Sequence, residues 1–212
     1  MTAYELVGTG WLADRAQADA TSRLRHSWSS PDNGRRAAHG EPIARITIPR
    51  LGPGWGYTIL EGTDHTVLAD GPGHYADTPL PGESGNASVA GHRVGRGAPF
   101  DEIDTLGACD DVVVETRTSI VTYRVLPFTA TSSPCPGAPV LDPAYAGVLG
   151  REVVTPDDAT VLAPVPGRPK VWPQVTEPLL TLTTCHPRYS ARQRLIVHAV
   201  LVAGTTKAPS KE

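Results

Sequence analysis

A β-strand that ends on a cysteine is predicted by residues 179–185, Leu-Leu-Thr-Leu-Thr-Thr-Cys. Apolar and threonine side chains alternate along this run, and the residues from His186 to Ser190 break the pattern. A second apolar run begins at Arg194 and continues to Val202, so we expect the two runs to form a β-hairpin. The thiol of Cys185 then lies at a strand end, accessible while its backbone is held rigidly, which suits a nucleophile.

Another strand-like run, residues 87–93 with the sequence Ala-Ser-Val-Ala-Gly-His-Arg, brings a histidine to its end. A thiol becomes a strong nucleophile as a thiolate, and a nearby imidazole or guanidinium stabilises that anion. Acyl transfer also needs positive charge or N–H donors where the oxyanion develops. We therefore interpret Cys185 as a nucleophile, His92 as its proton carrier and Arg194 as the oxyanion partner.

Other residues near the thiol compete for these roles. Arg188 and Arg192 lie in the turn between the two strands, whereas the preferred arginine opens a strand that fixes its direction. His186 follows the cysteine directly, but adjacent strand residues point to opposite faces, so we do not expect it to carry the proton. Thr183 and Thr184 are either ordinary strand residues or part of a substrate groove, and the sequence leaves both interpretations open.

The composition indicates one β-rich domain without a nucleic-acid or membrane patch. The chain has 212 residues, with 21 glycines and 21 prolines that favour many turns. Charge is nearly balanced, 19 Lys and Arg against 22 Asp and Glu, so no electrostatic footprint for nucleic acid is expected. No run approaches the roughly 20 apolar residues that span a bilayer, and no signal-peptide pattern opens the chain. Taken alone, this sequence is predicted to be soluble.

The pattern along the chain predicts a helix followed by many short strands. The helix is expected from about residue 11 to residue 26, and a turn-rich linker over residues 29–36 precedes an ordered domain that begins near Pro42. Strands are expected at 43–48, 57–61, 86–92, 111–115 and 119–126, with loop at 70–75 and a short helix at 98–106. We expect eight strands in all, the final hairpin included, and short strands that close on themselves give a small barrel.

Three separated motifs resemble the sortase family of transpeptidases. They are Ala-Gly-His-Arg at residues 90–93, Thr-Leu-Thr-Thr-Cys at 181–185 and Arg-Leu-Ile-Val at 194–197, supported by the runs at 71–75, 80–82, 85–86 and 99–100. Their order and spacing fit over roughly residues 43–202. The form Thr-Leu-Thr-Thr-Cys-His-Pro, in a chain rich in Ala, Gly and Pro, is most similar to the class E sortases of actinobacteria.

The resemblance implies an all-β fold, a closed eight-stranded barrel with short helices and an N-terminal helix. Residues 1–41 are then a juxtamembrane helix and linker, residues 42–205 the catalytic domain and residues 206–212 a disordered tail. The resemblance also implies that His92, Cys185 and Arg194 are the catalytic set. The family is anchored in the membrane by an N-terminal helix at the extracellular face of the cell, and we expect that anchor to be absent from this chain.

The activity implied by the resemblance is that of a cysteine transpeptidase. Such an enzyme cleaves a C-terminal sorting signal, Leu-Ala-x-Thr-Gly in class E or Leu-Pro-x-Thr-Gly in others, between Thr and Gly through a thioacyl-enzyme. Its partners are surface proteins that bear the signal and an amine of the peptidoglycan precursor. The alternatives are a cysteine hydrolase of surface peptides and an inactive surface adaptor. The Ser/Thr-His-Gly-Cys motif of an L,D-transpeptidase is absent.

Residues 127–178, which are rich in proline and glycine, connect the early strands to the nucleophile strand. A connection of that length is usually a functional loop or has structure of its own. We expect it to form a wall of the substrate groove, in which Val161 and Leu162, with Val153–Val154 and Val165, receive the leucine of the signal. No cofactor is predicted: the histidines lack zinc-ligand spacing with the cysteines, and the few carboxylates of this segment favour calcium independence.

Three cysteines leave one free thiol if the other two pair, as expected of an exported protein with one structural disulfide. Cys109 precedes the strand predicted at 111–115, and Cys135 follows its hairpin partner. The two residues flank the same open end of one hairpin, where their Cα atoms can approach closely enough for a bond. We predict a disulfide between Cys109 and Cys135, the alternative being two unrelated buried thiols.

Overall fold

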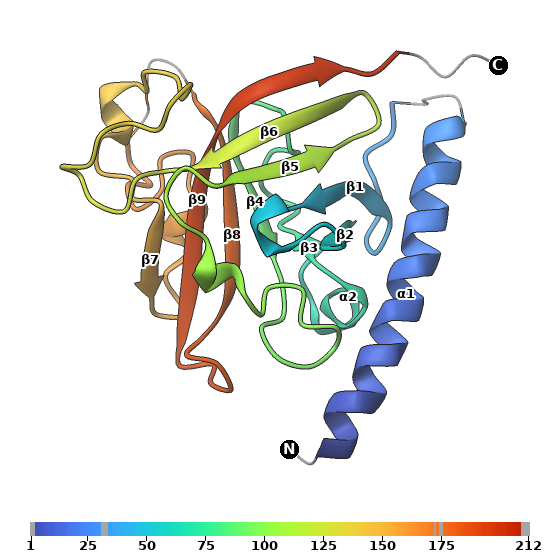
Figure 1. Cartoon of the computed structure of the whole chain (residues 1–212). Coiled ribbons are helices and arrows are strands. Elements are labelled where there is room, and N and C mark those ends of the chain that lie inside the picture. The colour runs from blue at the N-terminus through green and yellow to red at the C-terminus, as the bar shows by residue number, and fades with distance from the viewer. Residues whose placement is uncertain (1–2, 31–33, 172, 174–175, 209–212) are drawn as a thin grey trace.

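The computed structural model describes residues 3–30, 34–171, 173 and 176–208. Eight strands close into a barrel, beside which a long N-terminal helix lies (Figure 1). The helices are α1 (Ala3–Ser29) and α2 (His65–Asp70), and the short 3₁₀ helices are η1 (Pro49–Leu51), η2 (Ile103–Thr105), η3 (Pro143–Tyr145) and η4 (Ala159–Leu162). The strands are β1 (Pro42–Thr47), β2 (Gly56–Glu61), β3 (Gly73–His74), β4 (Gly85–Ala90), β5 (Asp111–Glu115), β6 (Ser119–Val125), β7 (Arg151–Val154), β8 (Pro178–His186) and β9 (Gln193–Thr206).

The length of β9 closes the barrel. The strand order is β6-β5-β1-β2-β3-β4-β8-β9, and a further pairing between β9 and β6 joins the two ends. The first part of β9 pairs with β7, which lies outside the ring, and the part from Ala199 to Thr206 pairs with β6. The predicted closed barrel is therefore confirmed, and closure leaves no exposed edge along these strands.

Alternate residues of the strands supply the barrel core. On β8, Leu180 and Leu182 belong to this core together with their cross-strand partners on β9. Leu179 points the other way and packs in a second cluster that includes Tyr145 and Val165. Because side chains alternate along a strand, Cys185 shares the outer face with Leu179.

Several local predictions differ from the structure. The N-terminal helix extends beyond both expected ends, and the loop expected at 70–75 contains the two-residue strand β3. The helix expected at 98–106 is reduced to η2, and the strand expected at 86–92 ends at Ala90. The segment from residue 127 to residue 178 contains β7, η3 and η4. Residues 31–33 of the predicted linker and 209–212 of the predicted tail lie outside the described residues.

The helix α1 is attached to the barrel by polar side chains. The side-chain Oε1 of Gln17 accepts the N–H of Thr58 at 2.7 Å, and its Nε2 donates to the carbonyls of Thr58 and Asp70. At the other end, Arg117 donates to the carbonyls of Ser27 and Ser30 and so satisfies the last turn of the helix. No helix in the described part of the chain is long and apolar enough to cross a membrane.

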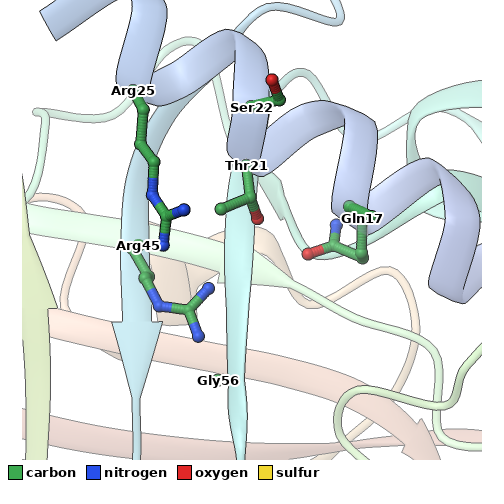
Figure 2. Close-up of a pocket in the computed structure, with 7 residues that line it drawn as sticks. Gln17, Thr21, Ser22, Arg25, Arg45 and Gly56 are labelled. Atoms are coloured by element: carbon green, nitrogen blue, oxygen red, sulfur yellow. The ribbon is translucent and has the colours of Figure 1, made fainter.

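A cavity of about 450 Å³ lies between α1 and the strands β1 and β2 (Figure 2). The guanidinium groups of Arg25 and Arg45 extend toward it, and no carboxylate is among its lining residues. In the ring of strands, β1 is opposite β8. The cavity is therefore on the far side of the barrel from Cys185.

The predicted disulfide is present. Cys109 and Cys135 are bonded, with their Cα atoms 5.3 Å apart. Cys109 lies in the turn before β5, and Cys135 follows β6, so the bond ties the start of the long connecting segment to the β5–β6 hairpin. Cys185 is the free cysteine.

Candidate active site

The predicted nucleophile lies near the end of β8, directly opposite Arg194 of β9. Directly opposed residues of an antiparallel pair have side chains on the same face, so the thiol and the guanidinium share the outer face of the barrel. Both residues are half-buried. Strand pairing therefore sets the position of Arg194 relative to Cys185.

The histidine reaches the same level from the other side of β8. The strands β4 and β8 are parallel, with Ala90 opposite Thr183. The pairing continues past the end of β4, because the N–H of Gly91 donates to the carbonyl of Thr183 at 3.0 Å. Continuing this register by two residues brings His92 level with Cys185. The structure thus gathers the three predicted catalytic residues at one end of three adjacent strands.

The surroundings of His92 favour its neutral form. The residue is half-buried, and burial lowers its pKa below the ordinary value of 6.5, as do the positive charge of Arg96 and the nearby His65. Its Nε2 atom has no hydrogen-bond partner in the part of the chain that the structure describes. This nitrogen is therefore available to take or give a proton.

In the hydrogen bonds of the described residues, the guanidinium of Arg194 uses one of its three nitrogen atoms. Its Nη1 atom donates to the carbonyls of Ala191 and Gln193, each at 3.0 Å, which holds the side chain against its own turn. A guanidinium has five N–H donors, so several remain for a developing negative charge. Arg188 is instead paired with Asp101 at the surface.

A buried arginine engages the histidine next to the thiol. Arg93 is 4% exposed, donates from Nη1 to the Nδ1 atom of His186 at 2.9 Å, and forms an ion pair with Asp104. The Nδ1 atom of His186 is thus an acceptor in this contact. That His92, and not His186, carries the proton stays a prediction.

The two threonines before the cysteine have different partners. The hydroxyl of Thr184 donates to the carbonyl of Gly91 at 2.7 Å and so ties β8 to the residue before His92. The hydroxyl of Thr183 lies 3.0 Å from that of Tyr75, on the same strand face as the thiol. In the sequence Tyr75 ends the motif at residues 71–75, and that motif is the one signal that points to it.

A family model for the sortase domain matches residues 46–202. This range covers most of the chain and contains His92, Cys185 and Arg194. The chain belongs to the sortase family. Its closed barrel is also the fold of a solved sortase, the SrtF sortase from Corynebacterium diphtheriae, which has 38% sequence identity and a TM-score of 0.73, covering 86% of this chain and 97% of that one.

Relatives from Streptomyces bear out the predicted similarity to class E sortases. The chain is 30% identical to sortase SrtE2 of Streptomyces coelicolor, covering 94% of this chain and 74% of that protein. It is 29% identical to sortase SrtE1 of the same organism, covering 98% of this chain and 54% of that protein, so it spans about half the length of SrtE1. The solved sortase E from Streptomyces avermitilis has 34% identity and a TM-score of 0.61, covering 82% of this chain and 97% of that one.

The segment expected to form a wall of the groove contributes β7, which pairs with β9, and η4, which contacts β4. Its residue Val161, at η4, is 4% exposed, and its carbonyl accepts from the Nδ2 atom of Asn86 at 3.0 Å. Leu162 is half-buried, whereas Val153 on β7 is 43% exposed. Val154 is the cross-strand partner of Arg194, so β7 borders the site directly. Directly opposed residues share a face, so Val154 lies on the face of Arg194, whereas Val153 is opposite the core residue Leu195 and lies on the other face.

No cluster of three or more His, Cys, Asp or Glu side chains that could hold a metal ion occurs among the described residues of this sortase domain.

Proposed function

We propose that this chain is a cysteine transpeptidase that cleaves a C-terminal sorting signal between Thr and Gly through a thioacyl-enzyme on Cys185. One observation carries the proposal: a free thiol, a histidine whose Nε2 has no hydrogen-bond partner among the described residues, and an arginine lie at the same end of three adjacent strands. The chain's membership of the sortase family supports the same chemistry.

The proposed reaction has two acyl transfers. The thiolate of Cys185 attacks the carbonyl carbon of the threonine, and Arg194 donates hydrogen bonds to the oxyanion that forms. The C–N bond to glycine then breaks, and His92 gives a proton to the leaving amine. An incoming amine attacks the thioester, His92 takes its proton, and the thiolate leaves as the new amide forms.

The lowered pKa of His92 has a kinetic consequence for this mechanism. The reactive pair is a thiolate with an imidazolium, and burial of the histidine disfavours the charged imidazolium. Charging the buried imidazole therefore costs more than charging an exposed one. We expect slow turnover that depends on the fraction of the enzyme that carries both charges.

The proposed substrate groove follows the outer face of β8. We assign Thr183 and Tyr75 to its floor beside the thiol, and the segment with Val154, Val161 and Leu162 to its wall. Thr184 supports the groove through its bond to the backbone before His92. The proposed signals are Leu-Ala-x-Thr-Gly and Leu-Pro-x-Thr-Gly, carried by surface proteins at the extracellular face of the cell membrane, and the proposed acceptor is an amine of the peptidoglycan precursor.

Incubation with labelled peptides tests the proposal. Each signal peptide is mixed with the protein, with and without an added amine. The masses of the enzyme and of the products are then measured by mass spectrometry. We expect an acyl adduct on Cys185, and an amide product when amine is present. The Cys185→Ala variant should form neither. Free acid as the sole product despite added amine would indicate a hydrolase, and the absence of adduct and product would indicate an inactive adaptor.

A further inference from the structure

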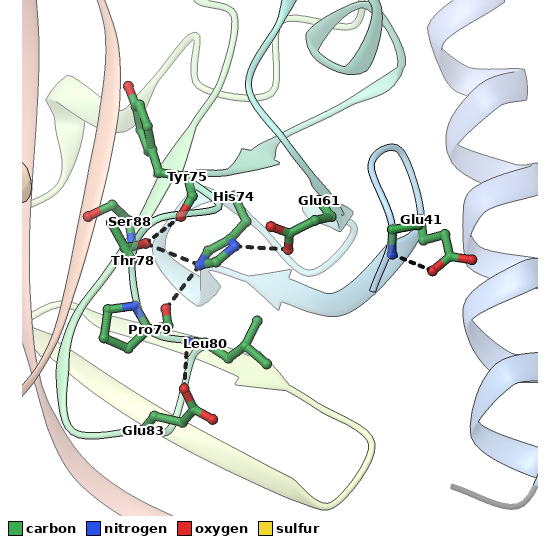
Figure 3. Close-up of polar contacts among 10 residues, drawn as sticks. Glu41, Glu61, His74, Tyr75, Thr78, Pro79, Leu80, Glu83 and Ser88 are labelled. Carbon is green, nitrogen blue, oxygen red and sulfur yellow. Dashed lines mark hydrogen bonds and ion pairs between the residues drawn. The ribbon is translucent and has the colours of Figure 1, made fainter. Parts of the chain in front are cut away.

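His74, at the end of β3, makes contacts through both ring nitrogens (Figure 3). Its side chain is 2% exposed, and that of its partner Glu61 is 12% exposed. The two residues are directly opposite each other in the parallel pairing of β2 with β3. Because buried polar atoms are nearly always hydrogen-bonded, the partners of the ring indicate which protons it carries.

The Nε2 atom of His74 must carry a proton. It lies 2.9 Å from the carbonyl oxygen of Pro79, which can only accept. Its second neighbour is the hydroxyl of Thr78 at 3.1 Å, and that hydroxyl donates its own proton to the carbonyl of Tyr75 and accepts from the N–H of Ser88. Thr78 therefore has no proton left for the ring, and the Nε2–H of His74 is shared between the two oxygens.

The Nδ1 atom of His74 faces the carboxylate of Glu61, whose Oε2 lies 3.0 Å away. A neutral ring with its proton on Nε2 would direct the Nδ1 lone pair at this carboxylate, and two facing acceptors are costly in a buried place. We propose that His74 is a buried imidazolium, and that the His74–Glu61 ion pair is a positioning element that anchors the turn carrying Tyr75 beside the nucleophile.

The anchored turn leads directly to the proposed groove. The N–H of Tyr75 donates to the carbonyl of Ser88 at 3.0 Å, and its hydroxyl meets that of Thr183, two residues before Cys185. In Figure 3 the ring of Tyr75 points away from His74, so the imidazolium holds the backbone while the phenol is left to reach β8. This step rests on the proposed function, in which Tyr75 and Thr183 form the groove floor.

Among the described residues, the groups that face His74 add no charge beyond that of Glu61. Among the described residues, Glu61 supplies its ionisable hydrogen-bond partner, from β2. From β4 the register partner is Val89, which is uncharged, and the turn contributes the oxygens of Thr78 and Pro79. The positive ring and the carboxylate therefore balance each other.

Nitrogen NMR of the whole protein tests the protonation directly. At neutral pH the nitrogen chemical shifts of both ring nitrogens of His74 should lie in the range of protonated imidazole nitrogens. The signals are assigned by their loss in His74→Gln. In Glu61→Gln the amide can donate to a neutral ring, so Nδ1 should move to the unprotonated class while Nε2 stays protonated. A wild-type spectrum with a single protonated nitrogen would overturn the proposal.

Peptide kinetics test the positioning role. Glu61→Ala leaves a buried cation without its partner, and KM for the labelled Leu-Ala-x-Thr-Gly peptide should rise on the order of tenfold. Alkylation of Cys185 by iodoacetamide should keep its rate, because the thiol itself is untouched. Glu61→Gln should hold KM within about twofold of the wild type, since one hydrogen bond is retained. The matched control is Glu83→Ala, an exposed carboxylate nearby that bonds to the N–H of Leu80 instead.

A double-mutant cycle separates this inference from the proposed function. If the ion pair acts through Tyr75, Glu61→Ala should raise KM far less in a Tyr75→Phe background than in the wild type. Additive effects overturn the positioning role, as does an unchanged KM in Glu61→Ala. If Tyr75→Phe alone leaves KM unchanged, the groove assignment fails while the nitrogen spectra still decide the protonation of His74. If Glu61→Ala does not fold, the proposal is tested by the nitrogen NMR spectra of the wild type and of Glu61→Gln.

Discussion

Removal of the disulfide between Cys109 and Cys135 should lower stability by an amount that follows from the loop it closes. The cysteines are 26 residues apart, and a loop of this length constrains the unfolded chain by about 3.5 kcal/mol in the chain-entropy model. Unfolding entropy of about 2.1 cal/mol/K per residue then converts this loss into a fall in Tm of about 8 °C for the whole chain. Alanine is the suitable replacement, because Cys109 has a φ of 70° and alanine keeps the same backbone strain.

Thermal unfolding followed by circular dichroism measures this effect. The wild type with and without a reducing agent is compared with the Cys109→Ala/Cys135→Ala variant. The reduced wild type and the variant should unfold at similar temperatures, and the variant should not respond to the reducing agent. Alkylation of Cys185 in the folded protein should keep its rate, because the disulfide lies at the β5–β6 hairpin and the thiol lies at the end of β8.

Thiol counting makes the experiment decisive. Denatured, unreduced wild type should show one free thiol, and fully reduced protein should show three. If three thiols are counted after reduction and Tm has not moved, the reasoning from loop closure is wrong for this chain.

Three further changes test the active site. Arg194→Ala should lower kcat for peptide cleavage by about 10²–10³-fold, since an oxyanion donor is lost, while alkylation of Cys185 changes far less; equal losses in both assays would contradict this role. Gly91→Ala would place a Cβ 2.5 Å from the buried ring of Phe100, so we expect a loss of about 1–3 kcal/mol in a urea melt and slower cleavage as His92 is displaced. A fully stable and active Gly91→Ala variant would show that the ring of Phe100 moves aside at little cost. Because burial lowers the pKa of His92, the unfolded chain binds a proton before the folded protein does, and stability should fall as pH falls below 6.5 toward the folded value. That part of the pH dependence should be missing in His92→Asn, and an unaltered slope would refute it.

The sequence by itself determined the strand that ends near Cys185 and its hairpin partner. Alternation along residues 179–185 set which side chains of β8 enter the core, and β8 and β9 pair as the hairpin pattern predicted. The motifs that contain His92, Cys185 and Arg194 pointed to the family before any pairing was known. These features are local, because residues close in the chain encode strand, turn and buried face.

Only the tertiary structure decided how distant segments meet. The two-residue strand β3 exists because β2 and β4 pair with it on either side, and no local pattern indicates such a short strand. The same pairing brings Glu61 to His74, and the turn that follows brings Tyr75 to Thr183, more than a hundred residues away in the chain. Likewise, β9 closes the barrel by reaching β6. Such contacts depend on which strands become neighbours in the closed sheet. Each long-range pairing must offset the entropy lost when the loop between the two strands is closed, and this depends on the whole sheet and not on a local stretch of sequence.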